Sequence, residues 1–149
     1  MIESFRDILE ELMDENNLSI TDLSNNLQMD YKQLSNYVKG VYAPSLKSAL
    51  KLADYFQCSL DYLCGLVETK SVNNYLQPDF LFYERYKKLL DERKITHYKL
   101  TKDCGINVND SRLWKQGKVP TLITLYKIAD YLSVSIDFLI GRKVINSTL

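Results

Sequence analysis

The sequence predicts an all-α protein built from two tandem five-helix domains, and three observations lead to this prediction. Apolar residues recur at intervals of three and four along most of the chain, which indicates amphipathic helices. Residues that favour helix ends flank these segments, and no alternating strand pattern competes with them. The second half also repeats the first: 77 positions separate Phe5, Leu12, Leu23 and Gly40 from Phe82, Leu89, Leu100 and Gly117.

The repeat continues after one residue is lost from a loop. Residues 51–55 (KLADY) recur 76 positions later as residues 127–131 (KIADY), and residues 59–63 (SLDYL) recur as residues 135–139 (SIDFL). Each repeat is long enough for one small domain. We therefore expect domain 1 at residues 1–67 and domain 2 at residues 78–142, joined by a polar linker at residues 68–77.

Each repeat is expected to hold five helices. Those of the first lie near residues 2–15, 19–27, 30–39, 45–56 and 59–65, and those of the second near residues 79–93, 96–103, 107–116, 121–132 and 135–141. Ser19 and Asp22 have the spacing of a capping box. N-caps are also expected at Asp30, Ser45, Ser59, Thr121 and Ser135. Pro78 fits the first turn of the sixth helix, and residues 142–149 are expected to form a loose tail.

Composition limits the class of protein. Hydrophobic residues make up 46% and charged residues 26%, which is ordinary for a soluble globular chain. No apolar run is long enough to cross a membrane, and the acidic N-terminus does not read as a secretory signal. Cys58, Cys64 and Cys104 form no C-x-x-C motif, so we expect reduced thiols in a cytoplasmic protein without metal or cofactor.

The charges are distributed unevenly, although the formal net charge is zero. Residues 1–68 carry five basic and eleven acidic side chains, and residues 78–149 carry thirteen basic and eight acidic ones. Residues 31–51 nevertheless hold four lysines and no acid. One face of the acidic first half can therefore be positive, as a nucleic-acid contact requires.

Residues 19–40 (SITDLSNNLQMDYKQLSNYVKG) carry the most specific pattern. Leu23, Leu27, Met29, Leu34 and Tyr37 fit the buried seam of two short helices joined by a tight turn. This stretch resembles the helix-turn-helix of lambda-repressor-like (XRE/Cro-type) transcription regulators, with Ser24 at the small position and Tyr37 at the usual tryptophan position. The resemblance implies a double-stranded DNA partner, with the second helix in the major groove.

The polar face of that second helix is expected to comprise Tyr31, Lys32, Gln33, Ser35, Asn36 and Lys39. The resemblance implies that Tyr31, Lys32, Gln33 and Asn36 read bases. Lys32 suits guanine, and Gln33 or Asn36 suits adenine. Lys39 and Lys47, with Tyr42 and Ser45, would lie over the phosphate backbone. Ile20 departs from the family, which often has a phosphate-binding glutamine there.

The second motif, residues 96–117, offers a poorer set of base contacts. Its candidate DNA-binding residues are His97, at the usual glutamine position, with Asn109, Arg112, Lys115 and Lys118. Val108, Asp110 and Leu113 share the expected reading positions but lack suitable donors or carry the wrong charge. Ser111 replaces the usual buried Ile or Leu, which predicts a rotated or irregular helix. The cations around this motif, Lys99 and Lys102 included, suit non-specific phosphate contact.

These features favour a sequence-specific DNA-binding transcription regulator, acting as a homodimer or as an intramolecular pseudo-dimer. Leu66, Val67, Ile140, Val144 and Ile145 are candidates for the dimer interface. The alternative is a protein–protein interaction module, antitoxin-like or a co-regulator, since the oppositely charged halves suit pairing. A mixed role is also open, in which repeat one reads DNA and repeat two handles phosphates or dimerisation. An enzyme is the least supported class, because no nucleophile and acid accompany the only histidine, His97. Most tyrosines, such as Tyr55, Tyr62, Tyr86 and Tyr131, are expected in the core.

Overall fold

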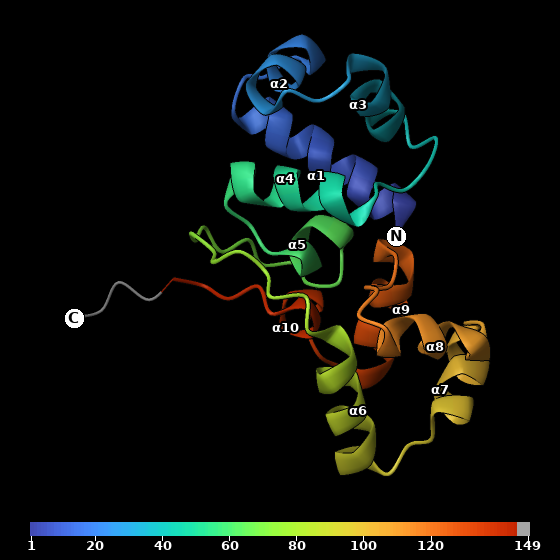
Figure 1. Ribbon diagram of the computed structural model, residues 1–149. Coiled ribbons are helices and arrows are strands. Elements are labelled where there is room, and N and C mark those ends of the chain that lie inside the picture. Colours follow the sequence, from blue (N-terminus) through green and yellow to red (C-terminus); the bar gives the residue numbers. More distant parts are fainter. Residues whose placement is uncertain (146–149) are drawn as a thin grey trace. The chain divides into compact units, whose positions relative to one another are not determined.

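The computed structural model describes residues 1–145 and divides the chain into two compact units, Met1–Asn74 (unit 1) and Tyr75–Leu149 (unit 2). The regular structure of the described residues is helical, apart from one antiparallel bridge between Tyr75 and Val144 (Figure 1). The predicted all-α class, with one helical domain in each repeat, is therefore confirmed. Each unit is described on its own below.

Unit 1 contains α1 (Ile2–Glu15), α2 (Ile20–Leu27), α3 (Tyr31–Val38), α4 (Leu46–Phe56) and α5 (Leu60–Cys64). Helix α1 packs on α3 and α5, and α2 packs on α3 and α4. The side chains between these helices, including Phe5, Leu23 and Leu34, are completely buried. One face of α3 is therefore buried against the core, and the rest of its surface is not covered by these helices.

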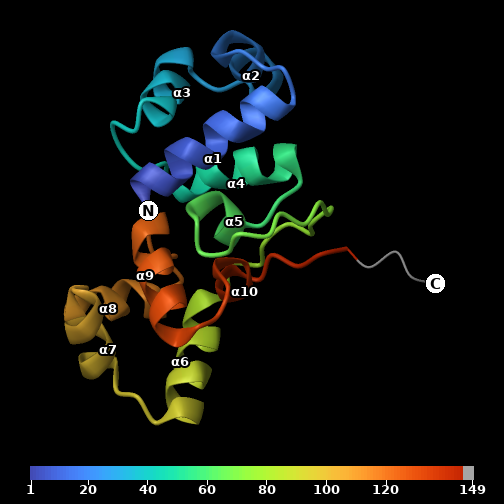
Figure 2. The ribbon, with the colours of Figure 1, turned by 180° about the vertical axis from the view of Figure 1, so that it is seen from behind.

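Unit 2 contains α6 (Phe82–Arg93), α7 (His97–Cys104), the 3-10 turn η1 (Val108–Asp110), α8 (Ser111–Lys115), α9 (Leu122–Leu132) and α10 (Ile136–Ile140) (Figure 2). Its core includes an aromatic cluster in which Trp114 meets Phe82 and Tyr86 edge to face, at centroid distances of 5.3 and 5.4 Å. The irregularity predicted for residues 107–116 is confirmed, because a 3-10 turn precedes a helix of only five residues.

The predicted caps form in both units. The Ser19 hydroxyl accepts from the Asp22 N–H, and the Asp22 carboxylate accepts in return from the Ser19 N–H. The predicted N-caps Asp30, Ser45, Ser59, Thr121 and Ser135 each accept from a backbone N–H three residues on. The C-terminal caps of four helices are not glycine. Helices α2, α4, α6 and α9 end at other residues in the left-handed region: Gln28, Gln57, Lys94 and Ser133, with φ between 52° and 55°.

The start predicted for the sixth helix is wrong. Helix α6 begins at Phe82 rather than residue 79, so Pro78 lies outside its first turn. The Asp79 carboxylate accepts from the Leu81 N–H at 2.9 Å and pairs with Arg85 at 2.5 Å. These bonds hold residues 79–81 outside the helix, and Phe80 takes a positive φ of 58°. The Arg85 guanidinium also holds the pKa of the Asp79 carboxyl well below its usual value.

The predicted linker, residues 68–77, is largely exposed but is held at several points by hydrogen bonds and an ion pair. In unit 1, Lys70 pairs with Glu15 at 2.9 Å, and the Asn73 N–H donates to the Gln57 carbonyl at 2.9 Å. In unit 2, the Leu76 N–H donates to the Lys143 carbonyl at 2.7 Å. These contacts fix the linker at Lys70, Asn73 and Leu76, so it is not a freely flexible connection.

The expectation of a loose tail is wrong for residues 142–145, and residues 146–149 lie outside the described part. Arg142 is buried, pairs with Asp137 at 2.7 Å, and lies over the Tyr75 ring at 3.7 Å from the centroid. Ile140 is completely buried, so it cannot join the predicted dimer interface, whereas Val67, Val144 and Ile145 are exposed. Among the described residues, no helix combines the length and apolarity that crossing a bilayer requires.

Candidate nucleic-acid interface

The turn between α2 and α3 is fixed by side chains of the motif itself. The Ser24 hydroxyl donates to the Met29 carbonyl at 2.5 Å across the turn, and the buried Met29 side chain anchors it to the core. Gln28 closes α2 in the left-handed conformation, and the Asp30 carboxylate then accepts from the Gln33 N–H at 3.0 Å to start α3. These local contacts set the direction in which α3 leaves the turn.

Helix α3 divides into a buried and an open side. Leu34 and Tyr37 pack into the core, while Tyr31 is 53% exposed and Lys32 and Lys39 are also exposed. The sequence places Ser35 on the open side, but it is buried. Helix α3 packs on both α1 and α2, so its covered arc is wider than a single apolar stripe and takes in the small Ser35 side chain.

The two amide side chains of α3 differ in how much they can offer a ligand. The Gln33 amide nitrogen donates to the Tyr37 hydroxyl at 2.8 Å and to the Ser48 hydroxyl at 3.3 Å. Both of its N–H groups are therefore committed, and the adenine contact predicted for Gln33 would have to break these bonds. Asn36 donates only to the Tyr42 hydroxyl, at 3.1 Å, which leaves one N–H and its carbonyl oxygen for a base.

Four exposed lysines surround the open side of α3. Lys32 and Lys39 lie on and next to α3, and Lys47 and Lys51 lie on α4. None of them makes an ion pair with another side chain in the described residues 1–145. Tyr42 and Ser45 are exposed on the connection between the two helices. The structure thus brings together the residues predicted for repeat one, as a cationic surface whose lysines form no ion pair in the described residues, with Asp30 near Lys47 and Lys51.

His97 in unit 2 is used inside the protein. Its Nδ1 lies 2.7 Å from the Tyr86 hydroxyl, and its Nε2 lies 2.8 Å from the Val108 carbonyl oxygen. Because a carbonyl only accepts, Nε2 carries the proton and Nδ1 accepts from Tyr86. Burial raises the pKa of Tyr86, which keeps that hydroxyl protonated. Neither ring nitrogen is left for a phosphate, so we withdraw the DNA contact predicted for His97.

The remaining candidates of repeat two are exposed side chains on η1 and α8 and in the turn that follows α8. Asn109, Arg112, Lys115 and Lys118 are exposed, and the three cations make no ion pair with a side chain in the described part of the chain. Val108 and Leu113 are 42% and 39% exposed among them. This surface can attract phosphates, but it offers few groups that could distinguish bases.

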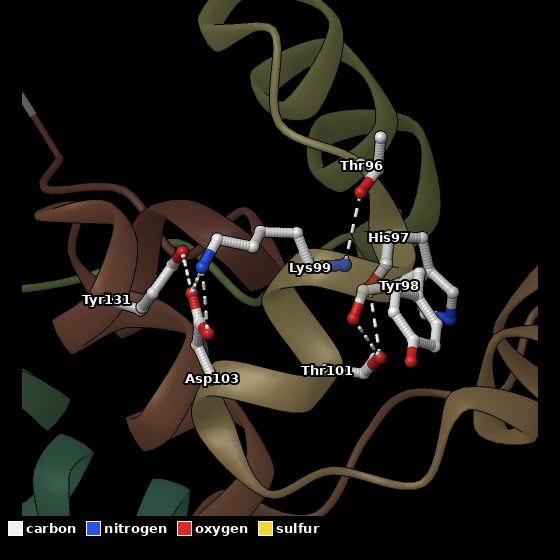
Figure 3. A network of polar contacts seen from close by, with 7 residues as sticks. All are labelled: Thr96, His97, Tyr98, Lys99, Thr101, Asp103 and Tyr131. Carbon is white, nitrogen blue, oxygen red and sulfur yellow. Dashed lines mark hydrogen bonds and ion pairs between the residues drawn. The ribbon is translucent and has the colours of Figure 1, made fainter.

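A pair of equivalent hydrogen bonds ties each helix-turn-helix to its own scaffold. In unit 1, the Asn26 amide donates to the Tyr55 hydroxyl at 3.0 Å, which links α2 to α4. In unit 2, the Tyr131 hydroxyl donates at 2.6 Å to Asp103, which also pairs with Lys99 at 3.1 Å (Figure 3). The Tyr131 hydrogen bond, aided by Lys99, lowers the pKa of Asp103.

Sequence reasoning missed these links. Tyr55 and Tyr131 were predicted in the core, yet they are 37% and 38% exposed, because their hydroxyls reach polar partners at the surface. The sequence does hold a signal: Asn26 and Asp103 are related by the same 77-residue offset as the rest of the motif. The Asn26 amide can donate to a phenol, and the Asp103 carboxylate can accept from one.

Two family models match the chain. The first, described as a helix-turn-helix, matches residues 9–63, and the second, described as a Cro/C1-type HTH DNA-binding domain, matches residues 85–143. Comparisons with curated proteins and with solved structures give no match. The two matched ranges fall on α1–α5 and α6–α10, and each contains the capped turn and core described above. The chain therefore belongs to the lambda-repressor-like (XRE/Cro-type) helix-turn-helix family, as a tandem of two domains.

Proposed function

We propose that this DNA-binding regulator reads its operator through unit 1, with α3 in the major groove. The carrying observation is the open side of α3, where Lys32 and Asn36 are available to base edges. Lys32 suits the acceptors of guanine, and the free N–H and carbonyl of Asn36 suit adenine. Tyr31 lies beside them and can contact a thymine methyl or a phosphate.

Phosphate contacts position this helix in the proposal. Lys39 and Lys47, with Tyr42 and Ser45, border the open side of α3, and neither lysine has to break an ion pair within the described residues to contact a phosphate. Unit 2 adds phosphate contacts through Arg112, Lys115 and Lys118, and Asn109 is its candidate for an adenine contact. This division agrees with the different chemistry of the two surfaces.

Two half-sites are part of the proposal, because a single small helix gives limited specificity. They are supplied by two copies of the chain or by its two units. For two copies, Val67, Val144 and Ile145 remain candidates for the interface. Sedimentation of the free and DNA-bound protein distinguishes one copy per operator from two. We propose a cytoplasmic location and no catalytic role.

The test begins with selection of binding sequences from a random duplex pool, followed by affinity measurements by fluorescence anisotropy. Lys32→Ala and Asn36→Ala are each expected to weaken binding to the selected sequence by about 1–3 kcal/mol, the worth of one specific base contact. Lys88→Ala, on the exposed surface of α6, is the charge-matched control and should change little.

Salt dependence separates the roles of these residues. Asn36→Ala should leave the slope of log affinity against log salt unchanged, whereas each lysine that contacts a phosphate contributes about one counterion to it. If both α3 variants bind the selected sequence as tightly as the unmodified protein, unit 1 does not read it.

The second candidate function is a protein-interaction module centred on unit 2. It is favoured by the exposed Val108 and Leu113 beside η1 and α8, where a dedicated DNA-reading helix would carry hydrogen-bonding groups. If selection from the random pool enriches no sequence, while a bound protein is recovered and its binding is lost in Leu113→Asp, this function takes the place of the first.

A further inference from the structure

A cavity of about 300 Å³ lies within unit 2, between α6, the start of α7 and the inner side of α8. Its apolar wall is formed by Tyr83, Tyr86, Leu90 and Ile95. Ser111 and Lys115 of α8 line the opposite side. The volume is at the lower end of the range for small-molecule sites, which suits a compact ligand.

The cavity follows from two differences between the repeats. Ser111 occupies the position that Leu34 holds in unit 1, where the leucine side chain is completely buried. Lys115 occupies the position of Val38. Both changes remove an apolar side chain that would pack beneath this helix. The Ser111 hydroxyl donates to the Val108 carbonyl only at a long 3.4 Å, so a ligand carboxylate could take the place of that acceptor.

The charges at the mouth favour an anion. Lys87 and Lys115 both line the cavity and are exposed, and neither pairs with an acidic side chain in the described residues. Asp91 is the single acidic residue among the lining side chains, so the excess is one positive charge. The half-buried Tyr83 ring and Ile95 offer apolar surface to a planar body, and the buried Tyr86 ring lies behind them. Together these groups describe a small aromatic monocarboxylate.

We propose that unit 2 binds such a carboxylate as an effector beneath α8. Its ring lies against Tyr83 and Ile95, and its carboxylate meets Lys87, Lys115 and the Ser111 hydroxyl. Helix α8 has only five residues and its inner side lacks the core leucine of unit 1, so a bound ligand would supply packing that the sequence omits. Resting on the proposed function, this binding would change the affinity of unit 2 for DNA.

Trp114 makes the binding step measurable without DNA. It is the only tryptophan of the chain, and its ring meets Tyr86 at 5.4 Å and His97 at 5.9 Å, two residues that line the cavity. Phenylacetate is the probe, with phenylacetamide as its uncharged counterpart. We expect phenylacetate to change Trp114 emission in a saturable manner and phenylacetamide to bind several-fold more weakly.

Variants locate the site. Lys87→Gln with Lys115→Gln should raise the Kd for phenylacetate by about threefold to tenfold, as expected for exposed charge pairs, while Lys88→Gln on the same helix leaves it unchanged. Ser111→Leu, which restores the side chain of repeat one, should abolish binding. Its thermal melt shows whether the variant is folded, and the lysine variants provide the test if it is not.

A linear, non-saturating response to phenylacetate, or an affinity that neither Ser111→Leu nor the double-lysine variant changes, overturns the effector site. DNA binding is measured separately, with and without saturating phenylacetate. Saturable binding without any effect on DNA affinity would retain the ligand site and reject its regulatory role. Loss of DNA binding in Lys32→Ala with intact ligand binding would leave both proposals standing.

Discussion

Individual side chains decide which of the predicted contacts are available. Residue types alone make Gln33, Asn36 and His97 equivalent candidates, because each carries groups that can bond DNA. Their hydrogen bonds distinguish them. The N–H donors of Gln33 and His97 already bond other groups of the protein, while Asn36 retains a donor and an acceptor for DNA. A hydrogen bond to a residue far along the chain leaves no trace in local sequence, so the sequence could not distinguish these three side chains.

The link between Tyr131 and Asp103 gives a prediction at this scale. In Tyr131→Phe, the Asp103 carboxylate loses the hydrogen bond that contributes most to lowering its pKa. We therefore expect the pKa of Asp103 to rise towards its ordinary value, although Lys99 keeps part of the effect. An NMR titration of the carboxyl carbon measures it. Tyr55→Phe, which removes the equivalent hydroxyl in unit 1, is the control and should leave the Asp103 titration unchanged.

The helices themselves are largely predictable, because their signals are local. Caps at Ser19 and Asp30 and the recurring apolar pattern locate the first helix-turn-helix motif, and the 77-residue repeat locates the second. The exception is instructive: α6 starts late because Asp79 bonds Arg85 and the Leu81 N–H. A proline followed by an acidic residue also resembles a helix start, so the pattern could not distinguish the two arrangements.

Asp30 provides the prediction for a single helix. Its carboxylate satisfies the Gln33 N–H at the start of α3, and a helix of eight residues depends on such a cap. Asp30→Ala should destabilise unit 1 by about 0.5–2 kcal/mol, the usual cost of losing an N-cap. Urea unfolding followed by circular dichroism measures it. Asp14→Ala, an exposed acid within α1 without a capping role, should stay close to the unmodified protein; equal losses in both would argue against a capping role for Asp30.

For the whole molecule, sequence repetition predicts two helical domains but does not predict how the segment after the last helix is held. Residues 142–145 were expected to be loose, yet Arg142 is buried in unit 2 with Asp137 and Tyr75. A cation near a chain end normally stays in water, so burial of this one could be inferred only from the aspartate that α10 places beneath it.

Removing Arg142 should therefore affect the stability of unit 2. Arg142→Ala leaves Asp137 buried without its guanidinium partner, a change that typically costs about 3–5 kcal/mol. The transition followed by Trp114 fluorescence, which reports on unit 2, is expected to move to lower temperature. Lys143→Ala is the neighbouring exposed control. An unchanged Trp114 transition in Arg142→Ala would mean that the ion pair contributes little to holding the domain together.

The four helices that end in left-handed Gln28, Gln57, Lys94 and Ser133 leave the protein room for improved heat tolerance. An L-residue in that conformation costs about 1–2 kcal/mol, a penalty that glycine avoids. Lys94→Gly and Ser133→Gly are expected to raise the melting temperature in scanning calorimetry, and Gln57→Gly to gain less, since the Gln57 side chain also bonds Asn74. A few such glycine substitutions would therefore give a more thermostable form of the protein for crystallography.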